Sequence, residues 1–209
     1  MITTLIVSRY NEDLAWLDHF QNPKVIYNKG KKLGIPGEII RPNFGGNQFD
    51  IFHFIHENYH NLPDYMAFVQ GYPFDHCSFE LMKDRINACA VGPLSNTVVE
   101  HNNSWYISKP WIESRLKGST KWKNEPTFSS FDEYASKIFK NYLRLEVLSF
   151  PQGSQILVSK EVCLSYSKEF WRLLMEIPLK DEEVNGGPEA HLIERSIELI
   201  FTNRFKGIV

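Results

Sequence analysis

The sequence predicts a single-domain α/β fold, a three-layer sandwich in which helices flank a mixed, mainly parallel sheet. Apolar runs of strand length recur along the chain, and apolar residues at helical spacing lie between them. The first runs are apolar on both strand faces, as in parallel strands that helices cover on either side. A length of 209 residues is enough for one compact domain with a sizeable core.

The N-terminal elements open a strand, helix, strand unit. A first strand is expected at 2–8, where a β-branched run ends in polar residues. Helical spacing between 14 and 20 leads to a second strand at 25–27, and a glycine- and proline-rich stretch follows with a short strand at 38–40. A helix is expected from about 47 to 60, because its large apolar residues share one face.

The later elements continue the alternation. The best buried-strand candidate lies at 65–69, and a further strand is expected at 155–158. A helix should start at 159 and run past 174, and a final helix should span 189–201 after a proline suited to a first turn. Residues 95–130 are irregular and too long for a plain connector, so we interpret them as a functional loop with some helix.

Composition excludes several classes of protein. The net charge is −2 and no segment gathers lysine and arginine, so nucleic acid is not an expected partner. Three cysteines without CxxC spacing indicate neither a disulfide scaffold nor a structural zinc site, and they fit a reducing, cytoplasmic location. The short apolar start is broken at Ser8, so neither a signal peptide nor a membrane span is expected.

A ligand site is expected where two predicted strands end. In open α/β sheets, ligands bind outside the carboxyl ends of the strands, so residues 9–13 and 70–76 should face the same crevice. Both segments carry side chains that bind or react with ligands.

The run Leu5 to Glu12 resembles the first strand and Tyr-Asn-Glu loop of family-2-like GT-A glycosyltransferases. The resemblance implies a GT-A-like, Rossmann-like domain whose loop holds the base and ribose of a nucleotide-sugar donor. The donor-binding residues that it implies here are Ser8, Arg9, Tyr10, Asn11, Asp13 and Gln70. Tyrosine offers a stacking face, and asparagine and aspartate offer acceptors for base or ribose. Alternatively, Asn11 to Asp13 merely cap the next helix.

A divalent cation, Mn²⁺ or Mg²⁺, is expected from the same resemblance, because GT-A enzymes commonly hold a metal against the leaving diphosphate. Their usual DxD motif is absent from residues 69–76, and Asp75 and His76 are the nearest substitutes. Alternatively, Asp75 bonds a local N–H in a turn that Pro73 sets.

The last predicted helix supplies the candidate catalytic groups. Glu189 and His191 lie in its first turn, where either could deprotonate an acceptor hydroxyl. The alternative is a solvated helix start with a surface Glu/Arg pair.

Two further clusters are weaker candidates. Helical spacing of His53, His56 and His60 would suit zinc, although a polar helix stripe explains it as well. The tryptophans and basic residues between 105 and 123 would suit an acceptor surface or would pack on the core.

Several motifs together identify the chain as similar to a family of microbial, fungal and viral proteins catalogued as domain of unknown function 3431. They are Arg-Tyr-Asn-Glu at 9–12, the run from Phe68 to His76, and Glu-Ala-His-Leu-Ile-Glu-Arg at 189–195. The expected function is sugar transfer from a nucleotide-sugar donor to a glycan or similar acceptor. Residues 1–76 would form the nucleotide-binding half and 77–209 the acceptor half. The alternative is a non-catalytic nucleotide- or carbohydrate-binding module.

Overall fold

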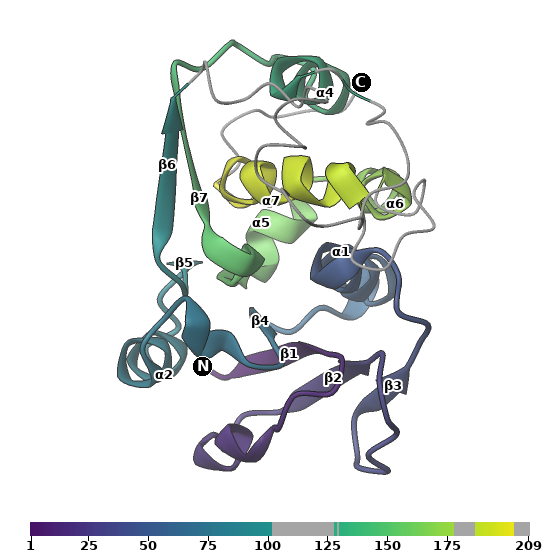
Figure 1. Cartoon of the computed structure of the whole chain (residues 1–209), viewed down its shortest axis with the longest axis vertical. Coiled ribbons are helices and arrows are strands. Elements are labelled where there is room, and N and C mark those ends of the chain that lie inside the picture. Colours follow the sequence, from purple (N-terminus) through teal and green to yellow (C-terminus); the bar gives the residue numbers. More distant parts are fainter. Residues whose placement is uncertain (102–127, 129, 178–186, 203–209) are drawn as a thin grey trace, which may run out of the picture.

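A computed structural model of the chain describes residues 1–101, 128, 130–177 and 187–202. Its centre is a six-stranded sheet in the order β3-β2-β1-β4-β8-β5 (Figure 1). The first four strands in this order are parallel, and β8 runs antiparallel to β4 on one side and to β5 on the other. The predicted α/β class with a mixed, mainly parallel sheet is therefore confirmed. The strands are β1 Thr3–Arg9, β2 Lys24–Asn28, β3 Glu38–Ile40, β4 Tyr65–Gln70, β5 Gly92–Pro93 and β8 Ile156–Ser159.

A two-stranded antiparallel sheet of β6 (Thr97–His101) and β7 (Val147–Pro151) stands beside the helices on one side of the molecule (Figure 1). The α-helices are α1 Gly46–Glu57, α2 Phe79–Asn87, α4 Phe131–Ile138, α5 Lys160–Leu164, α6 Lys168–Glu176 and α7 Gly187–Phe201. Short 3-10 helices are η1 Ala15–His19, η2 Tyr59–Asn61, η3 Pro73–Asp75 and η5 Gln152–Ser154.

The two faces of the sheet bury two separate apolar clusters. Ile6 of β1 and Phe68 of β4 belong to the larger cluster, which the sheet forms with α1, α6 and α7. Leu5 and Val7 point the other way, into a smaller cluster that includes residues of η1 and α2. This alternation follows the two-residue period of a strand, and it explains why β1 is apolar at nearly every position.

The predicted strands agree with the observed strands to within two residues. The segment after the first strand forms only a single 3-10 turn, η1. The long helix expected from 159 is broken in two, because the Ser167 hydroxyl accepts a hydrogen bond from the Phe170 N–H and starts a new helix there. Helix α2 and the β6–β7 pair were not predicted. Most of the expected functional loop, including its tryptophans, lies outside the described residues.

In the described parts of the chain, every helix is too short or too polar to cross a membrane.

Candidate functional site

A cleft of about 640 Å³ opens where β1 and β4 end. Helix α1, which precedes β4, covers one face of the sheet, and η1, which follows β1, covers the other. The carboxyl ends of β1 and β4 therefore form the topological switch point where α/β sheets bind ligands. Side chains from the ends of β1, β2 and β4 line the cleft with others from η5 and the starts of α1 and α7.

The loop after β1 presents two side chains to the cleft, Tyr10 and Glu12. The Glu12 carboxylate accepts a hydrogen bond from the Tyr10 N–H at 2.6 Å. Behind the loop, the buried Arg9 guanidinium donates to the carbonyl oxygens of Glu12 (2.9 Å) and Lys31 (3.1 Å) and to Asn28 Oδ1 (2.7 Å). Arg9 thus fixes the loop from behind rather than facing the cleft.

Two glycines allow neighbouring backbone to approach the same loop. A Cβ atom on Gly30 would lie 1.5 Å from the carbonyl oxygen of Tyr10. A Cβ atom on Gly71 would lie 2.5 Å from the Glu12 carboxylate. A larger residue at position 30 would therefore displace the loop backbone, and one at position 71 would displace the Glu12 side chain.

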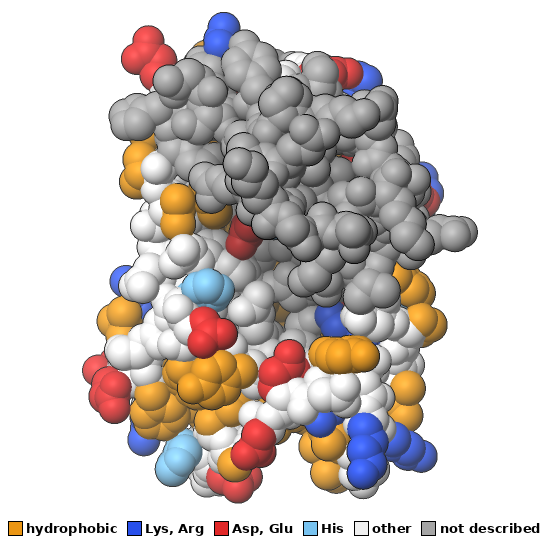
Figure 2. Space-filling view, in the orientation of Figure 1, with side chains coloured by type: hydrophobic (Ala, Val, Ile, Leu, Met, Phe, Trp, Pro, Cys, Tyr) orange, Lys and Arg blue, Asp and Glu red, His pale blue; other side chains and the backbone are white. Residues whose placement is uncertain are grey.

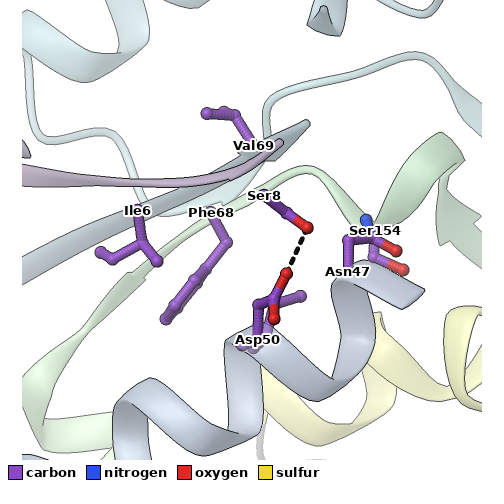
Figure 3. Close-up of a pocket in the computed structure, with 8 residues that line it drawn as sticks. Ile6, Ser8, Asn47, Asp50, Phe68, Val69 and Ser154 are labelled. Atoms are coloured by element: carbon purple, nitrogen blue, oxygen red, sulfur yellow. Dashed lines mark hydrogen bonds between the residues drawn. The ribbon is translucent and has the colours of Figure 1, made fainter. Parts of the chain in front are cut away.

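A buried charge network lies beneath the cleft. Asp50 of α1 is almost fully buried, and its carboxylate is 3.0 Å from Lys29 Nζ and 2.7 Å from Arg41 Nη1. It also accepts a hydrogen bond from the Ser8 hydroxyl (Figure 3). Burial lowers the pKa of Lys29 and of Arg41, and the Asp50 charge opposes that shift. Two cations face one carboxylate, so the network carries one net positive charge.

A small cavity of about 10 Å³ lies beside this network, between α1 and the sheet. Figure 3 shows Ser8 of β1, Asn47 and Asp50 of α1, and Ser154 converging on it from three elements. Ser8 and Asn47 also line the large cleft, so the buried network is in direct contact with the floor of the cleft.

The end of β4 and the segment that follows it contribute Gln70, Tyr72 and Asp75. Tyr72 and Tyr10 are each 50% exposed, and they are the two tyrosines among the described lining residues. Asp75 is exposed, whereas the neighbouring His76 is not part of the lining. This segment therefore provides one aromatic face, one amide and one carboxylate.

The start of α7 forms the opposite side of the cleft with His191 and Glu194. One Glu194 oxygen accepts a hydrogen bond from the Gly153 N–H at 2.7 Å, and the other lies 3.8 Å from His191 Nδ1. Glu189 is 1% exposed and does not line the cleft. Of the two predicted catalytic candidates, His191 is the one that the fold presents to a ligand.

The predicted site residues thus fall into two groups. The lining contains Ser8, Tyr10, Gln70, Asp75 and His191. Outside it are Arg9, Asn11, Asp13, His76 and Glu189. Asp13 accepts a hydrogen bond from the N–H of Ala15, the first residue of η1, whereas Asn11 accepts one from the distant Lys31 N–H and does not cap that helix.

Other lining residues were missed by the sequence analysis. Lys29 follows the second strand, and this position after a strand end was a signal that could have identified it. Asn47 and Gln48 occupy the first turn of α1, and Glu194 lies on α7. Their sequence context shows nothing beyond helix-compatible polar residues, so only the fold reveals them.

The described residues contain no group of three or more histidine, cysteine, aspartate or glutamate side chains placed to hold a metal ion. Asp75 is the member of the predicted metal pair that faces the cleft, and one carboxylate is an incomplete ligand set for Mn²⁺ or Mg²⁺. The His53 ring instead bonds the Tyr27 hydroxyl at 2.9 Å, and His56 pairs with Glu57. The described side chains therefore do not fit a protein-held metal.

One face of the molecule is seen in Figure 2. Below the grey segments, acidic and histidine side chains lie next to hydrophobic ones, a class that includes tyrosine there. Neither sign of charge covers the described part of this face. Such a mixture suits a ligand that has both ring surfaces and hydroxyl groups.

Fold and cleft together define an α/β protein with a polar, aromatic-lined cleft at the switch point of its sheet. Residues 5–206 match the family model described as a protein of unknown function, DUF3431. Because the match spans almost the whole chain, the chain belongs to this family. No curated protein and no solved structure matches it.

Proposed function

We propose that the protein binds a nucleotide-diphosphate sugar in this cleft and transfers the sugar to a hydroxyl group of a glycan or similar acceptor. The observation that carries the proposal is the cleft at the ends of β1 and β4, with Tyr10 and Tyr72 half exposed in its lining. The likeness of the segment from Leu5 to Glu12 to the donor loop of GT-A enzymes supports the same assignment.

The chemistry of the lining suits a nucleoside and a sugar. Exposed tyrosine rings stack on flat bases and on the apolar faces of sugars. The amides of Asn47, Gln48 and Gln70 offer both donors and acceptors, and the Glu12 and Asp75 carboxylates offer acceptors for hydroxyl groups. A volume of about 640 Å³ lies within the range of clefts that bind small molecules and cofactors.

The charge of Lys29 on the floor of the cleft favours a diphosphate, while the carboxylates of Glu12, Asp75 and Glu194 also line the cleft. Lys29 lines the cleft and belongs to the network that carries one net positive charge. Its ammonium group donates to Ser8 Oγ (2.7 Å), Gly46 O (3.2 Å) and Asp50 (3.0 Å), so all three protons have protein acceptors. Lys29 therefore favours an anion mainly through its charge.

In the transfer step, His191 would accept the proton of the acceptor hydroxyl. The acceptor oxygen forms a bond to the anomeric carbon. The bond between that carbon and the diphosphate oxygen breaks, and its electron pair leaves with the nucleoside diphosphate. The positive charge of Lys29 would stabilise this leaving group.

The test is thermal-shift and calorimetric titration with UDP-, GDP- and dTDP-sugars, each with and without Mn²⁺. We expect one nucleotide class to raise the melting temperature, and Tyr72→Ala to weaken its binding about tenfold or more. Leu143→Ala is the matched control, because this exposed side chain does not line the cleft and its loss should leave binding unchanged.

The outcomes separate the alternatives. Stabilisation followed by sugar release or transfer supports the enzyme. Stabilisation without turnover assigns the cleft to a non-catalytic nucleotide- or carbohydrate-binding module. If no nucleotide stabilises the protein, the donor assignment is wrong. Asp75→Asn tests the predicted metal dependence, because it should abolish any part of the shift that requires Mn²⁺.

A further inference from the structure

We infer that Glu194 is the positioning residue of His191, and that the two side chains act as one acid–base pair on the α7 side of the cleft. Both line the cleft, three residues apart on α7, so they share a helix face. Glu194 Oε2 lies 3.8 Å from His191 Nδ1. The reaction that we assign to this pair rests on the proposed function. The pairing of the two side chains rests on their geometry.

Glu194 is itself held in place. Its other oxygen, Oε1, accepts a hydrogen bond from the Gly153 N–H at 2.7 Å, and its side chain is only 18% exposed. A carboxylate fixed at one oxygen has few orientations left for the other. The second oxygen is consequently presented to the imidazole.

The turn that holds Glu194 is strained and doubly anchored. Gly153 and Ser154 both have positive φ angles, of 65° and 54°, and only glycine adopts this region freely. Asn47 Nδ2 donates to the Gly153 carbonyl at 2.5 Å, and Gln48 Nε2 donates to Ser154 Oγ at 3.1 Å. Strained backbone that two neighbouring side chains maintain is typical of functional sites.

At hydrogen-bond distance this arrangement would select one form of the imidazole, and the 3.8 Å in the structure is longer than a hydrogen bond. A carboxylate beside Nδ1 favours the tautomer with the proton on Nδ1, which leaves the lone pair on Nε2. Nε2 then accepts the proton of the acceptor hydroxyl, and Glu194 stabilises the imidazolium that forms. The 3.8 Å separation is an ion-pair distance, and catalytic contacts of this kind shorten when a ligand closes the site.

Other charged groups also face the cleft around His191. Glu12, Asp75 and Lys29 line it from the strand ends. Arg195 donates to the His191 carbonyl oxygen, and its guanidinium lies over the Phe150 ring at 5.2 Å. Glu194 differs from them in lying at 3.8 Å from the imidazole Nδ1 while the Gly153 N–H fixes its other oxygen.

The first experiment needs no substrate. Long-range ¹⁵N–¹H NMR on the full chain follows the tautomer and titration of His191 in the wild type and in Glu194→Gln, which keeps an acceptor for the Gly153 N–H. We expect the imidazole to lose its proton at lower pH in the variant and to lose its preference for Nδ1–H. Asp75→Asn, which removes a carboxylate elsewhere in the cleft, should change both less. An unchanged His191 titration in Glu194→Gln overturns the pairing.

The second experiment uses turnover, once a donor has been found. Glu194→Gln should lower kcat about tenfold or more and shift the pH profile, while the donor Kd stays the same. Glu194→Asp should restore part of the rate. If Glu194→Gln binds the donor and keeps the wild-type kcat, the role of Glu194 is refuted and the proposed function still stands. If no donor binds, the proposed function fails while the NMR result still decides the pairing.

Discussion

The two sides of the cleft are held in place by different kinds of contact. We call the ends of β1, β2 and β4 with their loops, together with the start of α1, the strand wall, and we call η5 with the start of α7 the helix wall. The strand wall is fixed by buried charges and by glycines pressed against backbone, as at Asp50 and Gly30. The helix wall is fixed by a strained turn and by hydrogen bonds between side chains and backbone, as at Ser154 and Glu194.

This difference has a thermodynamic meaning. Breaking a buried ion pair leaves an uncompensated charge in the interior, which destabilises the whole fold. Losing one hydrogen bond at a strained turn costs much less, about 1 kcal/mol. We therefore expect the strand wall to limit global stability and the helix wall to tolerate substitution. Side chains that move when they act on a substrate are better placed on the helix wall, where a local change costs less stability.

The largest effect is expected at Asp50. Asp50→Asn keeps the size of the side chain but leaves Lys29 and Arg41 without a counter-charge, so the free energy of unfolding should fall by about 3–5 kcal/mol. Urea denaturation measures this directly. The control on the same helix is Glu57→Gln, an exposed carboxylate whose loss should change stability by less than about 0.5 kcal/mol. Equal effects of the two variants would show that the buried charge network does not limit the stability of the fold.

The next effect is expected at Gly30. Gly30→Ala would place its Cβ atom 1.5 Å from the Tyr10 carbonyl oxygen, so the loop must move and stability should fall by about 2–4 kcal/mol. Gly34→Ala separates steric clash from backbone strain, because Gly34 has a φ of 71° but no described neighbour within 4 Å. It should cost about 1 kcal/mol. If thermal or urea unfolding gave comparable losses of stability for Gly30→Ala and Gly34→Ala, the close approach of Gly30 to the Tyr10 carbonyl oxygen would be contradicted.

The helix wall should respond about as weakly as Gly34. Ser154→Ala loses the hydrogen bond from Gln48 and keeps the strain of a φ of 54°, whereas Ser154→Gly loses the same bond and relieves the strain. The alanine variant should therefore be about 1 kcal/mol less stable than the glycine variant. The reverse order in urea denaturation would show that the turn is unstrained.

The smallest effect is a pH dependence from His53. Burial lowers the pKa of His53 below its ordinary value of 6.5 in the folded protein. Between the folded pKa and 6.5 the unfolded chain binds more protons, so stability rises with pH through this window. His53→Gln should flatten the rise in stability on the acid side of pH 6.5 relative to the wild type. An identical pH dependence in the variant would show that another group causes it.

The strand wall is also the wall that the sequence predicted best. Ser8, Tyr10 and Gln70 follow apolar strands whose pattern is local, and parallel strand ends meet at one edge of a sheet. The partners of these residues were not predictable. Asp50 reaches Lys29 and Arg41 only after α1 packs on the sheet, since in the sequence it is one polar residue within a helical pattern.

The helix wall shows the limit more clearly. Gly153 is hydrogen-bonded to Glu194, 41 residues away in the sequence, and to Asn47, 106 residues away. No periodic pattern in the sequence predicts contacts at such separations. The same limit applies to Glu189 and His191. Both share the first turn of α7, but packing buries Glu189 and leaves His191 in the cleft. Which face of a helix turns inward depends on its neighbours, and its own residues only narrow the choice.

The sequence by itself determined the α/β class, the principal strands and the strand ends at which a cleft would form, because apolar periodicity and turn residues act over short distances. The tertiary structure alone decided that Arg9 and Asp13 support the loop while Tyr10 and Glu12 face the cleft. It also decided that Lys29 sits in a charge network and that Glu194 faces His191. These outcomes depend on which side chains packing brings together from distant segments, and that is set by the whole core at once.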